Sequence, residues 1–188
     1  MKATRMIAVA GAANLKPRQR PTPALDTPTD LEDAAVKAVS EALNGLLADS
    51  YALYLKTKNF HWHVSGPHFR DYHLLFEEQA TDILGTTDDM AERVRKIGGT
   101  TIRSIGHVAK LQSVVEDNDK EFMAPATMLK ELMNDNKKVA EAMRKAHELC
   151  DEHDDIATAS LIEVWIDQTE KRTWFLFEAA REAGDSGH

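Results

Sequence analysis

Residues 58–99 read KNFHWHVSGPHFRDYHLLFEEQATDILGTTDDMAERVRKIGG, and this stretch decides the fold. It is interrupted at Gly66-Pro67, because neither residue favours the interior of a helix. Across residues 69–94 the apolar side chains recur at helical spacing, and the pair Gly98-Gly99 then ends the pattern. The stretch therefore predicts a helix that ends near His63, a tight turn, and a second helix that runs back along the first.

The helix before this turn is expected to begin near residue 29. Thr29 and Glu32 have the spacing of a capping box, in which the two side chains bond to backbone amides of the first turn. Small or apolar residues then recur at alternating steps of three and four: Val36, Val39, Leu43, Leu46, Ser50, Leu53, Thr57 and Phe60. We expect an amphipathic helix over about residues 29–63.

The second half of the chain repeats this hairpin pattern. Pro125 suits the first turn of a third helix, whose apolar face extends to Cys150, and a fourth helix is expected over about residues 156–183 after an acidic turn. The connection before Pro125 is too long for an ordinary hairpin loop, so we expect it to cross the bundle with a short helix near residues 107–115. Two hairpins joined by one crossover give an all-α, ferritin-like four-helix bundle.

Composition favours one domain that needs no covalent link. The chain has 188 residues, of which 43% are hydrophobic, and its one cysteine cannot form an intrachain disulfide. Residues 1–28 hold four of the six prolines without a helical or strand period, so we expect a flexible tail there, a bundle over 29–184 and a short C-terminal tail over 185–188. No stretch approaches the roughly 20 apolar residues of a membrane span. A cytoplasmic protein is expected.

Potential iron ligands gather around the first hairpin. They are His61, His73, Glu77, Asp88 and Glu92. At about 100° per residue, the four on the second helix fall near 0°, 40°, 60° and 100°, so they share one polar stripe. His61 and His73 lie six positions either side of Pro67, so a turn there can bring their imidazoles together. Spacing alone also fits a solvated face with packed histidines.

The axial distance along the second helix suggests a site shared between two chains. Glu77 and Asp88 are 11 positions apart, about 16 Å along a helix axis, which one metal centre cannot span. If a second copy packs antiparallel across a two-fold axis, its Asp88 and Glu92 meet the imidazoles of the first copy. Two equivalent sites then form per dimer. No histidine has a glutamate three positions before it, which rules against the Glu-x-x-His centre of single-chain ferritins.

Three motifs closely resemble the signature of the Dps family of mini-ferritins: KNFHWHVSGPHF at 58–69, HLLFE at 73–77 and DDMAER at 88–93. The resemblance returns at residues 167–177 and covers most of the chain except the tail. It implies a hollow dodecameric shell with ferroxidase centres at two-fold interfaces. There one subunit would supply His61, His73 and Glu77, and its partner Asp88 and Glu92. The implied reaction oxidises ferrous iron, commonly with hydrogen peroxide, and stores the ferric product inside the shell.

Several points stay open after this comparison. Relatives differ in which of the five ligands hold iron most tightly, and oxygen is the alternative oxidant. Trp62 lies next to His61, where an indole can pack at an interface or intercept stray oxidising equivalents. A structural shell with a degenerate metal site is a further possibility.

The resemblance also implies that iron enters through acidic three-fold pores near the start of the fourth helix. The local candidates are Asp151, Glu152, Asp154 and Asp155. Some relatives carry further acids where this chain has Ala157 and Ser160, which puts the pore lining in doubt. The plain alternative is an acidic helix N-terminus that interacts favourably with the helix dipole.

Charge is divided unevenly between the tail and the body. The formal net charge is -8, from 23 basic and 31 acidic residues, yet residues 1–25 hold five basic residues and no acid, which leaves the remainder near -13. The basic tail residues are Lys2, Arg5, Lys16, Arg18 and Arg20. Copies of this tail around a shell predict multivalent, sequence-independent and salt-dependent DNA binding, with association to the nucleoid. Alternatively, the tail only solubilises the protein or folds onto the shell.

Overall fold

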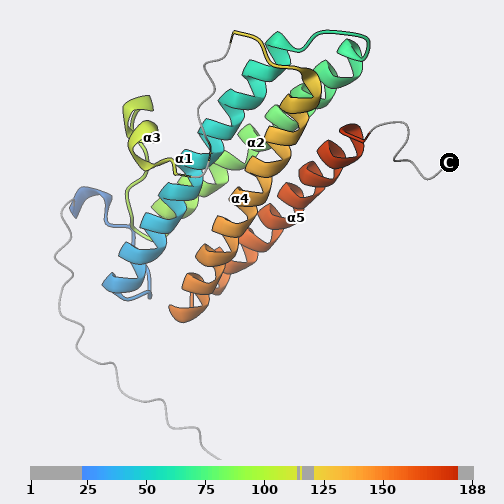
Figure 1. The fold of residues 1–188 in the computed structure, drawn as a ribbon. Helices are drawn as coiled ribbons and strands as arrows, with labels where there is room; N and C mark the ends of the chain where they lie inside the picture. Colours follow the sequence, from blue (N-terminus) through green and yellow to red (C-terminus); the bar gives the residue numbers. More distant parts are fainter. Residues whose placement is uncertain (1–22, 114, 116–120, 182–188) are drawn as a thin grey trace, which may run out of the picture.

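Four long helices form a bundle in the computed structural model, which describes residues 23–113, 115 and 121–181 (Figure 1). The elements in chain order are the 3-10 turn η1 (Pro23–Leu25) and the helices α1 (Asp33–His63), α2 (Phe69–Lys96), α3 (Ile105–Leu111), α4 (Pro125–Glu152) and α5 (Ile156–Ala179). Over these described ranges the chain has no strand. The predicted all-α class is therefore confirmed.

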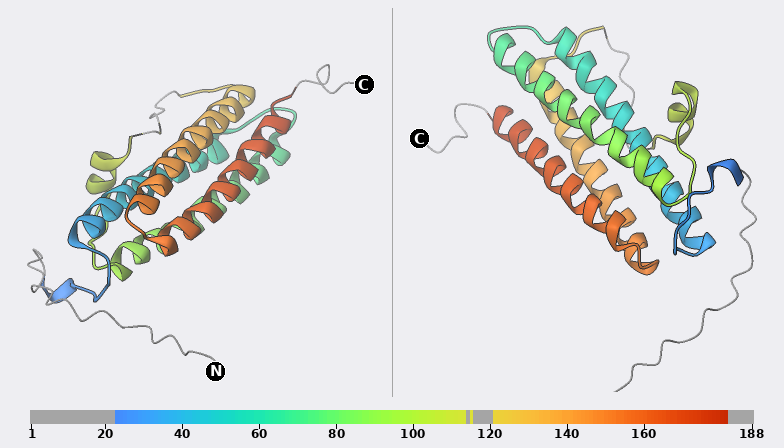
Figure 2. Two further views of the ribbon diagram at one scale, coloured as in Figure 1. Left: turned by 90° about the horizontal axis from the view of Figure 1, so that it is seen from below. Right: turned by 180° about the vertical axis from the view of Figure 1, so that it is seen from behind.

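The helices are connected as two hairpins with one crossover between them. α1 and α2 form the first hairpin and α4 and α5 the second, while the crossover leads from the end of α2 to the opposite end of the bundle (Figures 1 and 2). α1 packs against α2, α3 and α4, whereas α5 packs mainly against α4 and only slightly against α2. α2 and α4 therefore occupy opposite corners of the bundle, and the short α3 lies beside α1.

The core is built from the periodic faces that the sequence predicts. All eight periodic positions of α1 are buried, including the two hydroxyl residues. Ser50 and Thr57 are tolerated there because each hydroxyl donates to the carbonyl four residues earlier, at 2.8 Å. Large side chains such as Leu43, Phe76 and Leu129 are fully buried, and each contributes about 1.5–3 kcal/mol to stability.

The first helix begins later than expected. Its N-cap is Glu32, which makes no capping bond with its side chain, and its first residue is Asp33. The predicted capping box is therefore wrong. Thr29 Oγ1 instead accepts a hydrogen bond from the amide of Leu31 at 3.2 Å, which makes a local turn before the helix.

Two other helix bounds also differ from the prediction. The crossover helix begins at Ile105, because Ser104 caps it by accepting from the amide of His107 at 3.2 Å, and it ends at Leu111 rather than near residue 115. The last helix ends at Ala179, about one turn before residue 183.

The crossover is fastened to α1 by side chains that bond to its backbone. Asn44 Nδ2 donates to the carbonyl of Thr100 at 2.9 Å, and Asp49 Oδ1 accepts from the amide of Ser113 at 2.6 Å. On the tail side, Arg95 donates to the carbonyl of Leu25 at 2.8 Å. The division between tail and bundle at residue 28 stays a prediction, because residues 1–22 and 182–188 lie outside the described part of the chain.

Candidate metal centre

The first hairpin places two histidines side by side. His61 lies in the last turn of α1 and His73 near the start of α2. Between them, Gly66 has a φ of +107°, a conformation that residues with a side chain rarely adopt. Phe60 and Phe76, both buried, pack with ring centroids 6.4 Å apart and fix the alignment of the two helices. The predicted meeting of the two imidazoles therefore occurs within one chain.

Reciprocal hydrogen bonds hold the two imidazoles. The rings of His61 and His73 stack with centroids 3.8 Å apart and an interplanar angle of 24°. Nδ1 of each ring lies 2.9 Å from the backbone carbonyl oxygen of the other residue. A carbonyl only accepts, so each Nδ1 donates the hydrogen bond, and Nε2 is the ring atom left to face Glu77 or a metal ion. Carbonyls orient metal-binding histidines in the same way.

A glutamate and a lysine complete this cluster. Glu77 Oε2 lies 3.2 Å from His61 Nε2 and accepts a hydrogen bond from Lys58 Nζ. The hydrogen bond from Lys58 lowers the pKa of Glu77, so the carboxylate is ionised at neutral pH. Sequence reasoning missed Lys58. Its position three residues before His61, on the same face of a helix, was the available signal.

The other two predicted ligands lie farther along α2. Asp88 and Glu92 are exposed, and Glu92 pairs with Lys96 one turn later at 3.0 Å. Within residues 23–113, 115 and 121–181 of one chain, no group of three or more histidine, cysteine or acidic side chains is arranged to hold a metal ion. The structure stacks His61 on His73 and places Glu77 against His61, which is fewer ligands than a closed metal site needs. It does not join Asp88 and Glu92 to them within one subunit.

Comparison with known proteins identifies the family of this chain. The family model for the ferritin-like domain matches residues 40–182. A DNA protection during starvation protein from Brevibacillus brevis is 36% identical over 138 residues, which are 73% of this chain and 91% of that protein. The chain belongs to the Dps family of ferritin-like proteins. A second relative, DNA protection during starvation protein 1 from Deinococcus radiodurans, is 31% identical over 146 residues, 78% of this chain and 70% of that protein.

Solved Dps structures share this fold. A Dps protein from Bacillus brevis superposes with a TM-score of 0.75 at 31% identity, over 80% of this chain and all of that chain. DpsC from Streptomyces coelicolor superposes with a TM-score of 0.79 at 27% identity, over 84% of this chain and 91% of that one. A Dps protein from Vibrio cholerae, described as a member of the ferritin-like diiron-carboxylate superfamily, gives 0.76 at 26% identity over 83% of this chain and 98% of that chain.

Trp62 stands at the edge of the histidine cluster of this Dps subunit. Its side chain is 59% exposed, and Lys58 Nζ lies 5.8 Å from the centre of its ring. The indole is therefore open to solvent or to a second copy of the chain. Both interpretations of Trp62 made from the sequence stay predictions.

The acidic turn before α5 divides into exposed and buried carboxylates. Asp151, Glu152 and Asp154 are exposed, as a pore lining requires. Asp155 is only 3% exposed, because it caps α5 by accepting from the amide of Thr158 at 3.1 Å and pairs with Arg93 at 2.6 Å. Asp155 is therefore engaged as a helix cap and ion-pair partner, as the helix-terminus alternative describes, and a pore role for it stays a prediction.

The residues predicted to contact DNA cannot be placed. Lys2, Arg5, Lys16, Arg18 and Arg20 lie outside the described residues. Among the helices of the described part of the chain, none combines the length and apolar character needed to cross a lipid bilayer.

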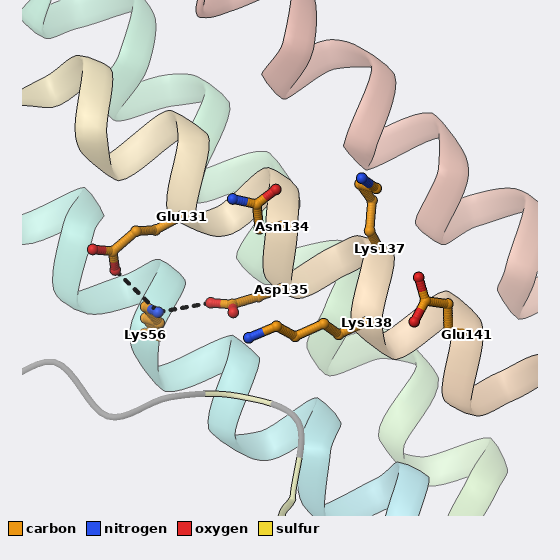
Figure 3. Close-up of a pocket in the computed structure, with 7 residues that line it drawn as sticks. All are labelled: Lys56, Glu131, Asn134, Asp135, Lys137, Lys138 and Glu141. Atoms are coloured by element: carbon orange, nitrogen blue, oxygen red, sulfur yellow. Dashed lines mark hydrogen bonds and ion pairs between the residues drawn. The ribbon is translucent and has the colours of Figure 1, made fainter.

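A second lysine–carboxylate cluster lies between α1 and α4 (Figure 3). Lys56 Nζ is 2.7 Å from Asp135 Oδ2 and 3.1 Å from Glu131 Oε2, beside a surface pocket of about 370 Å³. Burial raises the pKa of Asp135 despite its bond to Lys56. The pocket is lined by Lys56, Glu131, Asn134, Asp135, Lys137, Lys138 and Glu141, without histidine or cysteine. We interpret this cluster as a structural tie between two helices.

Proposed function

We propose that this Dps-family protein oxidises ferrous iron at centres shared between two copies and stores the ferric product inside a hollow dodecameric shell. The observation that carries the proposal is the oriented pair of imidazoles beside an ionised Glu77. Membership in a family with diiron-carboxylate relatives supports iron as the substrate. Asp88 and Glu92 of a partner subunit would supply the remaining carboxylates across a two-fold axis.

The ligand chemistry fits oxidation of iron. Imidazole nitrogens and carboxylate oxygens suit ferrous iron, and carboxylates favour the harder ferric product. His61 and His73 would present their Nε2 atoms, and Glu77 would exchange the ammonium of Lys58 for the metal ion. With hydrogen peroxide as oxidant, two ferrous ions give up one electron each, and peroxide and two protons become two waters. Pairing two electrons at one centre avoids release of hydroxyl radical.

The carboxylates of α2 provide the direct test. We expect Asp88→Ala with Glu92→Ala to slow peroxide-driven oxidation of ferrous iron, followed by stopped-flow absorbance, by at least about 100-fold. The matched control is Glu78→Ala with Asp89→Ala, which removes two exposed acids from the same helix. Wild-type rates in the Asp88 and Glu92 variant would refute the site. A solution mass near twelve times 21.0 kDa would support the shell.

The exposed acids of the α4–α5 turn support a route for iron into the shell. Asp151, Glu152 and Asp154 would attract cations electrostatically if three subunits meet there. Their combined replacement by the matching amides should slow iron uptake at low iron concentration and leave the oxidation rate at saturating iron unchanged. Equal uptake at low iron would remove these residues from the route.

DNA binding is the second candidate function. It is favoured by five basic residues and no acid within residues 1–25, and relatives named for DNA protection during starvation add support. Contacts of this kind depend on phosphate charge rather than on sequence, so they should weaken steeply with salt. We expect deletion of residues 1–22 to abolish DNA retention in a low-salt gel shift. Unchanged retention would refute binding through the tail.

A further inference from the structure

His147 lies in the seam between α4 and α5 with a carboxylate beside each ring nitrogen. Its Nε2 is 3.2 Å from Glu163 Oε1 on α5, and its Nδ1 is 3.3 Å from Asp151 Oδ2 one turn later on α4. The imidazole is 25% exposed, while the carboxylates are 64% and 67% exposed. The group is thus held by two helices and open to solvent, at the end of the bundle opposite the turn between α1 and α2 (Figure 1).

The spacing of these donors matches a pair of metal ligands. Metal–nitrogen and metal–oxygen bonds to zinc are about 2.0–2.2 Å long, so two ligands at angles between octahedral and tetrahedral lie about 3.0–3.5 Å apart. His147 Nε2 donates a hydrogen bond to Glu163 Oε1 at 3.2 Å, a separation in this range, so a metal ion would replace the proton between the two atoms. A carboxylate near the other ring nitrogen is the common partner of a metal-binding histidine, and Asp151 occupies that position.

The surrounding charge favours a cation at this place. Glu148 and Glu152 in the last two turns of α4 and Asp154 in the following turn are exposed, against the basic Arg144 and Lys145, of which Arg144 is paired with Glu170. Asp155 is neutralised by Arg93, but these three acids point to solvent. A concentration of exposed carboxylates raises the local concentration of cations and speeds their arrival.

We propose that His147 and Glu163 bind a divalent first-row transition-metal ion, with Asp151 orienting the imidazole. Two protein ligands leave the remaining positions to water, so the ion is held weakly and exchanges quickly, as suits a site of capture rather than storage. That the ion is ferrous iron rests on the proposed function. The binding of a metal by these residues does not.

The same seam contains a natural control. Arg144 on α4 pairs with Glu170 on α5, and both side chains are about half exposed. This pair joins the same two helices through the same kind of ionic contact, but a guanidinium has no lone pair to offer a metal. If the contact between His147 and Glu163 only held α4 against α5, removing it would change cobalt binding no more than removing the Arg144–Glu170 pair.

Cobalt(II) binding to the full-length protein tests the proposal. Cobalt(II) prefers the same ligands as ferrous iron and is not oxidised under the conditions of the measurement. Equilibrium dialysis is done in a background that carries His61→Ala, His73→Ala, Asp88→Ala and Glu92→Ala, so that the proposed ferroxidase site does not contribute. We expect added His147→Gln with Glu163→Gln to weaken the remaining cobalt binding at least tenfold, and Arg144→Gln with Glu170→Gln to leave it unchanged. Anomalous scattering at the cobalt edge should place the ion between His147 and Glu163.

Two results would overturn the proposal. One is cobalt binding that His147→Gln with Glu163→Gln does not change, and the other is an equal loss in the Arg144 and Glu170 variant. Circular dichroism and solution mass check that the variants fold and assemble. The single Glu163→Gln variant keeps the imidazole, so it should lose only part of the cobalt affinity. Failure of the proposed function appears separately, as equal iron oxidation by the wild type and the Asp88, Glu92 variant.

Discussion

Two lysines of α1 make the same kind of contact on opposite sides of the helix. Lys56 reaches Asp135 on α4, and Lys58, two positions later and about 200° around the helix, reaches Glu77 on α2. The Asp135 side chain is 4% exposed, whereas that of Glu77 is 46% exposed. Only the Glu77 pair has imidazoles beside it.

Because the two pairs differ in burial, they differ in the pKa of their carboxylates and in whether the carboxylate can exchange its cation. Desolvation raises the pKa of Asp135, although Lys56 lies against it, while the hydrogen bond from Lys58 lowers the pKa of Glu77. A buried pair cannot exchange its cation without leaving a charge in the core. A half-exposed pair beside two histidines can exchange its cation. We therefore infer that the Lys58 ammonium occupies the metal position until a metal ion replaces it, whereas Lys56 holds α1 against α4.

The largest difference should appear in stability. Lys56→Met strands the carboxylate of Asp135 in the core, and we expect a loss of about 3 kcal/mol in the free energy of unfolding. Lys58→Met leaves Glu77 in contact with water and should cost less than about 1 kcal/mol. Urea unfolding at one fixed protein concentration compares the two. Equal losses in the free energy of unfolding would contradict the assignment of Lys56 to a structural pair and Lys58 to an exchangeable one.

In metal binding the order is reversed: Lys58→Met should change the affinity and Lys56→Met should not. Lys58→Met removes a positive charge from the proposed site, so we expect roughly tenfold tighter cobalt binding, since a unit charge at about 4 Å contributes on the order of 1 kcal/mol even in water. Lys56→Met faces α4 and should leave the affinity unchanged. Isothermal titration calorimetry measures both. Weaker binding after Lys58→Met would show that Lys58 assists the metal rather than competes with it.

The smallest effect concerns the pH dependence of stability. Because the pKa of Asp135 is higher in the folded protein than in the unfolded chain, its protonation favours folding, and this contribution is lost as pH rises from the ordinary aspartate value of about 3.9 through the raised value. The free energy of unfolding of the wild type, relative to Asp135→Asn, should therefore fall with rising pH in this window. Urea midpoints at several pH values measure it. A constant or rising difference would contradict the assigned shift.

Much of this structure follows from local signals in the sequence. The long helices could be predicted because apolar periods and breaks at glycine or proline act within a few residues. The contact between His61 and His73 could be predicted because the turn between their helices is short. The capping box at Thr29 was wrong because Thr29 Oγ1 accepts from the amide of Leu31 in a local turn, and the helix begins only at Asp33.

Contacts between distant parts of the chain were the ones that sequence reasoning missed. Asp155 could be an exposed acid or a helix cap, and Arg93, 62 positions away, decides between them. Lys58 was given no role from the sequence, because its partner Glu77 lies 19 positions later, on α2. Each of these roles depends on a partner that the local pattern does not reveal.

Mixing two inactive variants tests most directly whether the iron centre is shared between chains. His61→Ala with His73→Ala removes the imidazoles, and Asp88→Ala with Glu92→Ala removes the carboxylates, so each variant alone should oxidise little iron. When the two are unfolded, mixed equally and reassembled, about half of the dimers pair unlike chains, and each such dimer has one intact site. We predict about a quarter of the wild-type oxidation rate. A mixture no more active than its parents would contradict the shared centre.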